Sequence, residues 1–292
     1  MTSSINPQIF REYDIRGIVG QDLTPESVAS IGKAIGTYIR RGGGKKMVIG
    51  RDVRSSSIGF RDILSKALNS TGCDVIDIGM VPTPVTYFAL HHFKADGGVM
   101  ITGSHNPPEY NGFKISQGVH SLYGKKVQEL KRLIEANDFE TGTGNTRQQE
   151  VLGDYMEKVC SILKISRKVK VVVDGGNGCF GIVGPDLLRR LGQDPVELFS
   201  EPDGTFPNHH PDPTVKEHLT HLIAKVRSEN AELGIGFDGD ADRIGVVDEK
   251  GHILWGDQLL TIFARDILSR NPGATIVGEV KCSQNLYKDI KK

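Results

Sequence analysis

Two stretches of the chain decide its fold: "KMVIGRDVRSSSIGFRDILSKAL", residues 46–68, and "VKVVVDGGNGCFGIVGPDLLRRL", residues 169–191. Each begins with a short apolar run rich in β-branched residues, continues through a polar loop and ends in a segment whose apolar residues recur at helical spacing. Strand, loop and helix in that order form the repeating unit of α/β proteins. The sequence therefore predicts an α/β fold in which this unit occurs at least twice.

The flanks of both stretches repeat as well. An amphipathic helix is predicted before each stretch, over residues 27–41 and 154–165, and a Gly-x-Asp turn with a further strand follows each one, over residues 71–79 and 192–199. The copies lie more than roughly 100 residues apart, far beyond the period of a solenoid. We therefore expect tandem domains rather than a stacked array.

A third copy starts near the C-terminus and does not finish. Residues 257–270 have the pattern of an amphipathic helix, and residues 274–292 begin with an apolar strand and continue into a helix. A strand and a helix without partner strands cannot bury both faces. We expect residues 251–292 to be the start of a third, truncated domain; the alternative is a short C-terminal element that packs on the second domain.

The boundary between the first two domains is predicted near "DFETGTGNTRQQ", residues 138–149, because this segment is polar, rich in Gly and Thr, and without apolar periodicity. The first domain would then span residues 1–143 and the second residues 144–250. A Pro-rich stretch inside the second domain, residues 200–214, is predicted to be a loop without regular helix.

Composition narrows the class of protein. Lys and Arg together number 36, equal to Asp and Glu, so the balance argues against nucleic acid or an anionic membrane as the main partner. No apolar run reaches the ~18 residues of a membrane helix, and the N-terminus has no signal-peptide pattern. The four cysteines form no CxxC pair and are expected to be reduced, so we predict a cytoplasmic protein.

The first chemical signal is "TGSHNPPEYNGFK", residues 102–114, which follows the apolar run Gly97–Ile101. Ser104 is therefore predicted to lie on a stiff loop just past the C-terminal end of a strand, where open α/β sheets bind ligands. We expect Gly103 to let a ligand approach the serine and the two prolines to hold the loop still. His105 and Lys114 flank the serine.

The second signal is "FDGDADR", residues 237–243, between two apolar strands. Asp238, Asp240 and Asp242 alternate, and a bound cation is the simplest relief of their mutual repulsion. Gly239 and Ala241 are small enough to permit the curl that brings the carboxylates together. Hard cations such as Mg²⁺ prefer oxygen ligands, and three Asp oxygens leave places for water or a phosphate oxygen.

The acidic segment has three other possible interpretations, each of which fits its sequence less well. An EF-hand loop requires Gly at its sixth position, where this chain has Arg243, and it requires helical rather than strand flanks. A haloacid dehalogenase-type phosphatase has Thr or Val where this chain has Asp242. A solvated acidic turn seldom carries three aspartates and an arginine against two buried strands.

Together, a hydroxyl on a rigid loop, nearby cations and a separate Mg²⁺ site suggest phosphoryl transfer through a phosphoserine. Arg16 and Arg243 could supply further positive charge. The segment "YDIRG", residues 13–17, is a compact polar motif between apolar segments and reads equally well as a simple turn.

Four motifs, "FREYDIRG", "TGSHNPPEYNGFK", "FDGDADR" and "VKCS", in this order and spacing, resemble the α-D-phosphohexomutase family, and within it the bacterial phosphomannomutase/phosphoglucomutase branch. The resemblance implies tandem three-layer α/β/α domains with mixed sheets: domains I and II and an incomplete domain III. It also implies interconversion of a hexose 6-phosphate and a hexose 1-phosphate, of mannose or glucose, through a phosphoserine and a 1,6-bisphosphate. Glucose or mannose 1,6-bisphosphate would be the activator.

The resemblance also assigns residues. Ser104 would be the phosphoserine, and one Mg²⁺ per chain would be held by that serine's phosphate with Asp238, Asp240 and Asp242. Catalysis would further involve charged and polar side chains around the serine: Arg16, Lys114 and His105. The phosphosugar would be contacted by three side chains from different parts of the chain: Tyr13, Arg243 and Lys281.

The chain also departs from the family pattern, because the loop that reads the sugar hydroxyls and the fourth domain are absent. We expect the missing C-terminal domains to complete the active site and the chain alone to be impaired as a mutase, since remote binding contributes to the rate. The alternatives are a non-catalytic Mg²⁺- and phosphosugar-binding protein or, less readily, a haloacid dehalogenase-type phosphatase.

Overall fold

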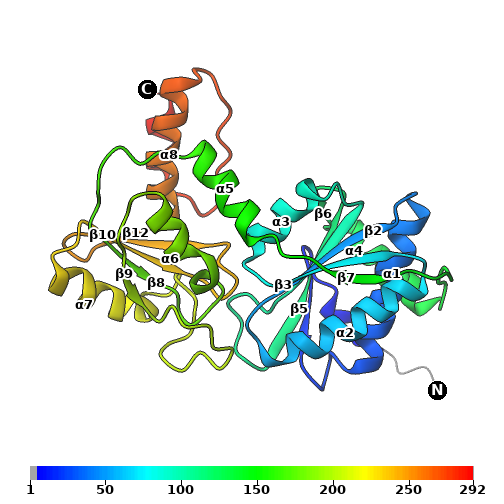
Figure 1. The fold of residues 1–292 in the computed structure, drawn as a ribbon. Helices are drawn as coiled ribbons and strands as arrows, with labels where there is room; N and C mark the ends of the chain where they lie inside the picture. The colour runs from blue at the N-terminus through cyan, green and yellow to red at the C-terminus, as the bar shows by residue number, and fades with distance from the viewer. Residues whose placement is uncertain (1–4, 292) are drawn as a thin grey trace.

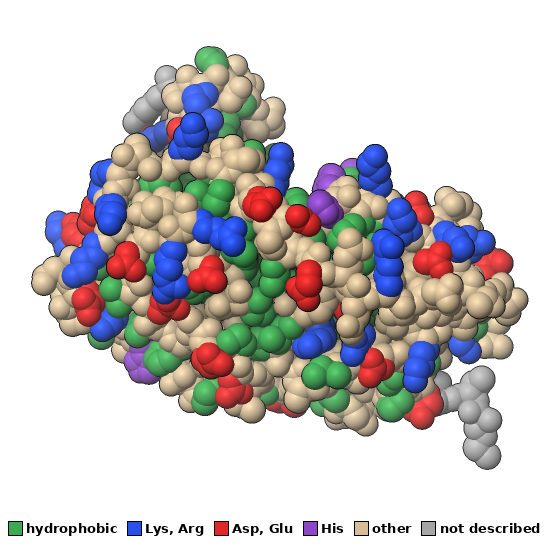
Figure 2. All heavy atoms as spheres, in the orientation of Figure 1, with side chains coloured by type: hydrophobic (Ala, Val, Ile, Leu, Met, Phe, Trp, Pro, Cys, Tyr) green, Lys and Arg blue, Asp and Glu red, His purple; other side chains and the backbone are tan. Residues whose placement is uncertain are grey.

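The computed structural model describes residues 5–291, which form two lobes, each built on its own β-sheet, with two further helices at the C-terminal end (Figure 1). Helix α5 (Leu152–Ile162) lies between the lobes in the chain and in space. Its Tyr155 packs edge-on against Phe88 of the first lobe, with ring centroids 5.6 Å apart. Figure 2 shows apolar side chains gathered along the boundary between the lobes on this face.

The first sheet has seven strands, in the order β1-β5-β4-β2-β3-β7, with β6 paired to β5. Strand β4 is parallel to β2 and antiparallel to β5, so the sheet is mixed. The bounds of its strands are β1 Ile15–Ile18, β2 Lys46–Arg51, β3 Asp74–Met80, β4 Gly97–Ile101, β5 Tyr110–Gln117, β6 His120–Ser121 and β7 Thr146–Gln148.

Helices cover both faces of this sheet: α1 (Pro25–Arg41), α2 (Ser55–Ser70) and α4 (Lys125–Glu135) on one side and α3 (Thr83–His92) on the other. Strand alternation explains the layers, because Met47 and Ile49 of β2 join the core under α1 and α2 while Val48 joins the core under α3. The lobe therefore has the expected three layers.

The second sheet has five strands in the order β12-β11-β10-β8-β9 and is also mixed. Helix α7 covers one face, where Leu222 and Val226 are buried, and α6 covers the other, where Phe180 stacks on Phe237. The bounds are β8 Val171–Asp174, α6 Phe180–Arg190, β9 Val196–Leu198, α7 Thr220–Glu229, β10 Leu233–Phe237, β11 Ile244–Asp248 and β12 Ile253–Leu254. Short 3-10 turns occur at Pro7–Ile9 and Lys216–Leu219.

The repeat predicted from the sequence is present in the topology. The four strands β5-β4-β2-β3 follow one another with antiparallel, parallel and parallel pairing, and β11-β10-β8-β9 do the same. Tandem α/β/α units with mixed sheets, as expected, make up the first two thirds and more of the chain.

Two local expectations differ from the structure. The strand predicted at the start of residues 274–292 does not form; residues 275–279 have no regular structure, and Val277 and Val280 are 83% and 96% exposed. Neither sheet pairs with this segment, and a strand without a hydrogen-bonded neighbour is not stable. Helices α8 (Gly256–Arg270) and α9 (Gln284–Ile290) flank it.

The other difference lies in the polar segment predicted as a linker. Part of it, β7, pairs in parallel with β3 at the edge of the first sheet, because backbone hydrogen bonds need no apolar side chains. All four cysteines are free. Between residues 5 and 291, no helix has both the length and the apolar character of a membrane span.

Candidate functional site

Two loops from the two lobes meet at the candidate site. The serine loop, residues 102–109, follows β4, and the acidic loop, residues 238–243, follows β10. The hydroxyl of Ser104 donates to Oδ2 of Asp238 across the boundary at 2.9 Å. The backbones also touch, since a Cβ added to Gly239 would lie 2.5 Å from the carbonyl oxygen of Ser104. The sequence-predicted serine and acidic signals thus form one site.

Ser104 is held in an unusual conformation. Its φ of +50° lies in the left-handed region, which costs a residue with a Cβ roughly 1–3 kcal/mol. Its N–H donates to Oγ1 of Thr102 at 2.7 Å, and the side chain is fully buried. The surrounding structure must therefore impose this geometry.

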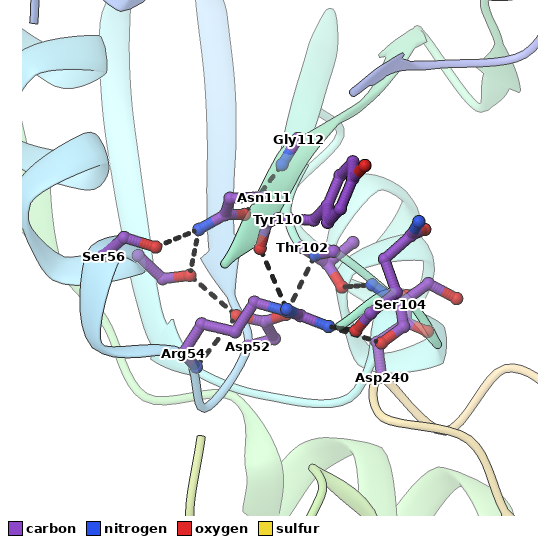
Figure 3. Close-up of polar contacts among 12 residues, drawn as sticks. Asp52, Arg54, Ser56, Thr102, Ser104, Tyr110, Asn111, Gly112 and Asp240 are labelled. Atoms are coloured by element: carbon purple, nitrogen blue, oxygen red, sulfur yellow. Dashed lines mark hydrogen bonds and ion pairs between the residues drawn. The ribbon is translucent and has the colours of Figure 1, made fainter. Parts of the chain in front are cut away.

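The residue that imposes it is Arg54, at the start of α2. The Arg54 guanidinium lies beneath the serine loop and donates to several of its backbone carbonyls (Figure 3). This explains Gly103 differently from our expectation: a Cβ there would lie 2.4 Å from Cζ of Arg54, so the glycine makes room for the guanidinium rather than for a ligand. Likewise, Arg54, and not the two prolines alone, holds the loop.

The acidic loop folds as predicted from its small residues. Asp238 Oδ1 accepts the backbone N–H groups of Asp242 and Arg243, at 3.0 and 3.1 Å, and Ala241 has φ +56°. As a result, one carboxylate oxygen from each of Asp238, Asp240 and Asp242 lies within 4.8 Å of the others.

These donors fit a hard divalent cation. Asp238 and Asp240 are fully buried, and Oδ1 of Asp240 has no hydrogen-bond partner among the described residues. A buried carboxylate oxygen without a partner is costly unless a ligand completes it. Oxygen donors in this number suit Mg²⁺ with further water or phosphate ligands.

Lys114 of β5 is the resident counter-charge of this cluster. Its ammonium group lies 2.5 Å from Oδ2 of Asp240 and 2.6 Å from Oδ2 of Asp242. Burial alone would lower the pKa of Lys114, but the two carboxylates outweigh it and raise the pKa well above its ordinary value. Lys114 is thus a permanent cation in this arrangement.

The carboxylates respond in opposite directions. Burial, together with the charges of Asp240 and Asp242, raises the pKa of Asp238. Burial would also raise the pKa of Asp240, but the neighbouring Lys114 lowers it below the ordinary value. Thr83 of α3 adds a hydrogen bond to Oδ2 of Asp240 at 2.5 Å. Negative charge is therefore held more readily on Asp240 than on Asp238, the carboxylate that accepts from the buried hydroxyl of Ser104.

The other predicted cations lie around the serine loop. Nδ1 of His105 accepts from the Arg243 guanidinium at 3.0 Å and lies 3.2 Å from the Ser104 hydroxyl, so this ring nitrogen carries no proton. Burial, followed by the charge of Arg243, lowers the pKa of His105. Arg16, on β1, is buried and donates to the side chains of Asn106 and Asp14.

A cleft of about 560 Å³ opens beside these groups. It is lined by Tyr13, Arg16, Lys114, Asp242 and Arg243, among others. Tyr13 is 74% exposed on its rim. Ser104 itself does not line this cleft, since it is covered by the two loops.

Lys281 is the one predicted site residue that the structure does not bring to the cluster. It lies between α8 and α9, is 88% exposed and pairs with Glu279 at 3.3 Å. Conversely, four residues that lie at the site were not predicted from the sequence: Arg54, Asp52, Thr83 and Asn106. A signal existed for the first two, because "GRDVR" runs from the end of β2 into the loop after it, and β2 is the parallel neighbour of β4.

Comparison with known proteins matches this architecture. The model of phosphoglucomutase/phosphomannomutase alpha/beta/alpha domain I matches residues 7–141, and that of domain II matches residues 124–251. The chain belongs to the phosphoglucomutase/phosphomannomutase family. The resemblance stated from the four motifs is confirmed.

Individual relatives of this family are similar over nearly the whole chain. A phosphomannomutase/phosphoglucomutase of Pseudomonas aeruginosa is 48% identical over 95% of this chain and 60% of its own length. A phosphoglucomutase of Neisseria gonorrhoeae is 42% identical over 99% of this chain and 64% of its own length. The chain thus spans about three fifths of the length of the curated relatives that it matches.

A solved structure agrees closely. The crystal structure of a phosphoglucomutase/phosphomannomutase family protein from Burkholderia thailandensis superposes with a TM-score of 0.95 at 44% identity, and the match covers 98% of this chain and 64% of that one. The two-lobe arrangement is therefore that of the family.

Proposed function

We propose that this chain carries a phosphoryl group on Ser104 and supplies part of the active site of a phosphohexomutase, which interconverts a hexose 6-phosphate and a hexose 1-phosphate, of mannose or glucose. One observation carries the proposal: the buried hydroxyl of Ser104 donates to Asp238, inside a cluster of three carboxylates that fits a divalent cation. The names of the relatives support the same reaction.

In the proposed reaction, the free hydroxyl of a sugar monophosphate attacks the phosphorus on Ser104. The bond from phosphorus to the serine oxygen breaks, the proton lost by the sugar hydroxyl is balanced by protonation of the serine oxygen, and a sugar 1,6-bisphosphate forms. After this intermediate has reoriented in the site, its other phosphoryl group is transferred to the serine oxygen. Rigid placement of the serine matters because donor and acceptor must be in line in both directions.

The roles of the surrounding residues follow from their charges. With its raised pKa, Lys114 serves as a cation that neutralises phosphate rather than as a base. Arg16 reaches the serine loop through Asn106, and Arg243 lies against His105. We propose that these cations and His105 stabilise the charge that moves with the phosphoryl group.

The metal site belongs to the same proposal. Asp238, Asp240 and Asp242, with an oxygen of the phosphorylated Ser104, would hold one Mg²⁺. When bound, that ion would neutralise negative charge on the transferring group. Tyr13, on the rim of the cleft, and Lys281 are proposed as sugar contacts, and glucose or mannose 1,6-bisphosphate as the activator. A cytoplasmic location remains a prediction.

The relatives extend beyond the part that this chain matches. We propose that their additional domains supply further contacts to the phosphosugar, which are needed for the full rate. The chain alone would then accept and hold phosphate on Ser104 more readily than it turns over a sugar phosphate.

The alternatives gain less support. In a haloacid dehalogenase-type phosphatase, Asp238 would itself attack phosphorus. Here both its oxygens are engaged, one by the N–H groups of Asp242 and Arg243 and the other by Ser104. A non-catalytic binding protein would share the cation site but would not take up phosphate on serine.

The test is mass spectrometry of the chain after incubation with glucose 1,6-bisphosphate and Mg²⁺. We expect one phosphate on the peptide that contains Ser104, none in Ser104→Ala, and normal uptake in the control Ser65→Ala, whose buried hydroxyl lies in α2 and has no hydrogen-bond partner within residues 5–291. Phosphate on Asp238 would support the phosphatase, and no phosphate on either residue would contradict the proposal.

A further inference from the structure

We propose that Arg54 is a positioning residue for phosphoryl transfer, which sets the place of the Ser104 hydroxyl by anchoring the whole serine loop. The inference rests on the proposed function of Ser104. Arg54 touches neither the hydroxyl nor the cation site. It lies at the start of α2, and its guanidinium points up into the turn between β4 and β5 (Figure 3).

Every N–H group of the Arg54 guanidinium donates a hydrogen bond. Nη2 donates to the carbonyls of Ser104 at 2.9 Å and Asn106 at 2.5 Å, and Nη1 donates to those of Pro107 at 2.5 Å and Tyr110 at 2.9 Å. Nε donates to Asp52, so all five N–H groups are satisfied. Four carbonyls of one turn converge on a single planar cation.

Few side chains can donate hydrogen bonds to four converging carbonyls at once. Carbonyl dipoles that point at one another repel unless a cation lies between them, and a buried carbonyl without a partner is costly. Lysine offers three donors from one point, whereas the five donors of arginine lie in a fixed plane. The turn therefore takes this shape because Arg54 is present.

Asp52 extends the same network to the other side of the serine. Its Oδ2 accepts from Nε of Arg54 and from the N–H of Gly103, both at 3.1 Å, and its Oδ1 accepts from the hydroxyl of Ser57 at 2.7 Å. The pair thus fixes the Thr102–Gly103 peptide through Asp52 and the Ser104–His105 peptide through Arg54. This accounts for the left-handed φ of Ser104.

The second lobe closes over the pair. The ring of Phe206 lies 5.2 Å from the Arg54 guanidinium, and a Cβ on Gly204 would lie 2.5 Å from the carbonyl oxygen of Val53. Arg54 is only 1% exposed as a result. The serine loop is therefore anchored by a buried guanidinium where the two lobes meet.

The consequence for the reaction is one of geometry. The serine oxygen must lie in line with phosphorus, and a misplacement of ~1 Å can cost about 100-fold in rate. Without the guanidinium, the four carbonyls would turn towards other partners and Ser104 would leave its left-handed conformation. Arg54 does not line the cleft beside the site, so we expect the binding of a sugar bisphosphate there to be little changed.

The test uses the full chain and the rate of phosphate uptake by Ser104 from glucose 1,6-bisphosphate with Mg²⁺. We expect Arg54→Ala to lower the saturated rate about 100-fold and to leave the half-saturating concentration within about 2-fold. Methylguanidinium, which can enter the space left by the side chain, should restore the rate at least about 10-fold. Arg54→Lys should stay close to Arg54→Ala, because one ammonium cannot serve four carbonyls.

Arg61→Ala is the matched control, because Arg61 lies on the same helix and its guanidinium pairs with Asp62 and the buried Asp77 rather than with carbonyls of the serine loop. It should keep the wild-type rate with and without methylguanidinium. Circular dichroism and thermal melting establish that each variant is folded.

Several results would overturn the inference. They are an Arg54→Ala rate within about 3-fold of wild type, a loss confined to the half-saturating concentration, a loss that methylguanidinium does not reverse, or the failure of both Arg54 variants to fold, which would assign the residue to stability alone. If the wild-type chain itself takes up no phosphate on Ser104, the proposed function fails instead, so the two failures are distinct.

Discussion

The serine loop and the acidic loop occupy equivalent places in the two sheets, yet they are held in different ways. Each follows a strand that has one parallel and one antiparallel neighbour, β4 in the first lobe and β10 in the second. The serine loop is fixed by Arg54, which lies 50 residues before Ser104 in the chain. The acidic loop is fixed from within, since Asp238 accepts the N–H groups of Asp242 and Arg243.

The two loops also differ in charge. The acidic loop carries three carboxylates, and its counter-charge, Lys114, is supplied by β5 of the first lobe. The serine loop is anchored by a cation of its own lobe, and the second lobe only covers that cation, through Phe206. The acidic loop therefore shapes itself but depends on its neighbour for neutralisation, whereas the serine loop depends on a distant side chain for its shape.

The largest effect on stability is expected from removing the charge of Lys114, which the first lobe supplies to the acidic loop. Lys114→Met leaves the buried Asp240 without its cation and Asp242 with only the more distant Arg243, and loss of one partner of a buried ion pair costs about 3–5 kcal/mol. In EDTA the variant should unfold at lower urea concentration, and its free energy of unfolding should fall by about that amount. Because Mg²⁺ fits the same carboxylates, it should restore much more stability to the variant than to wild type.

A matched control is Lys45→Met, which breaks a lysine–aspartate pair at a similar distance, 3.0 Å, but with both partners about half exposed. Its effect should stay within about 1 kcal/mol, with no dependence on Mg²⁺. Equal losses of stability in both variants, or equal stability of Lys114→Met in EDTA and in Mg²⁺, would show that the acidic loop does not need Lys114 as its cation.

A smaller loss is expected where the two backbones touch. In Gly239→Ala the new Cβ would lie 2.5 Å from the carbonyl oxygen of Ser104, a backbone atom that Arg54 holds in place. Overpacking of this kind costs about 1–3 kcal/mol and should push the loops apart, so urea stability and phosphate uptake by Ser104 should both fall.

Gly59→Ala is the control, since Gly59 lies in α2 and a Cβ there meets nothing within 4 Å. It should raise stability by up to about 1 kcal/mol through helix propensity. A Gly239→Ala variant as stable and as reactive as Gly59→Ala would mean that the loops can separate without consequence.

The comparison of the loops also explains what could be predicted from the sequence. The acidic site was predicted because its ligands, its small residues and its flanking strands all lie within one short segment, and Ser104 was predicted because its loop follows a buried strand. Arg54 was missed because its partners are backbone carbonyls of another loop, and the link between "GRDVR" and that loop becomes visible only once the order of the strands is known. The position of β7 and the missing strand after residue 274 were missed for a similar reason, since strand pairing depends on which sheet edge is within reach.

The last prediction concerns the strand neighbours of the two loops, which also differ in kind. Asp52, just after β2, is paired with the permanent cation Arg54, whereas Asp174, at the end of β8, is paired with His209 at 3.0 Å. Burial alone would lower the pKa of His209, but the hydrogen bond and charge of Asp174 outweigh it and raise the pKa. Only the second lobe therefore has a pH-dependent pair at this position.

The sign follows from the direction of the shift. A histidine whose pKa is raised on folding adds stability that is complete below its unfolded pKa, about 6.5, and is lost as pH rises through the folded pKa. The stability difference between wild type and His209→Gln should therefore be largest near pH 6, at roughly 1 kcal/mol for a charge-assisted hydrogen bond, and should shrink towards pH 9.

Taking the difference between the two proteins at each pH cancels the titration of His105 and His210, whose pKa values are lowered. Urea denaturation at several pH values measures this difference. A constant difference would mean that His209 stays neutral over this pH range. The two lobes would then be alike in their insensitivity to pH at this position.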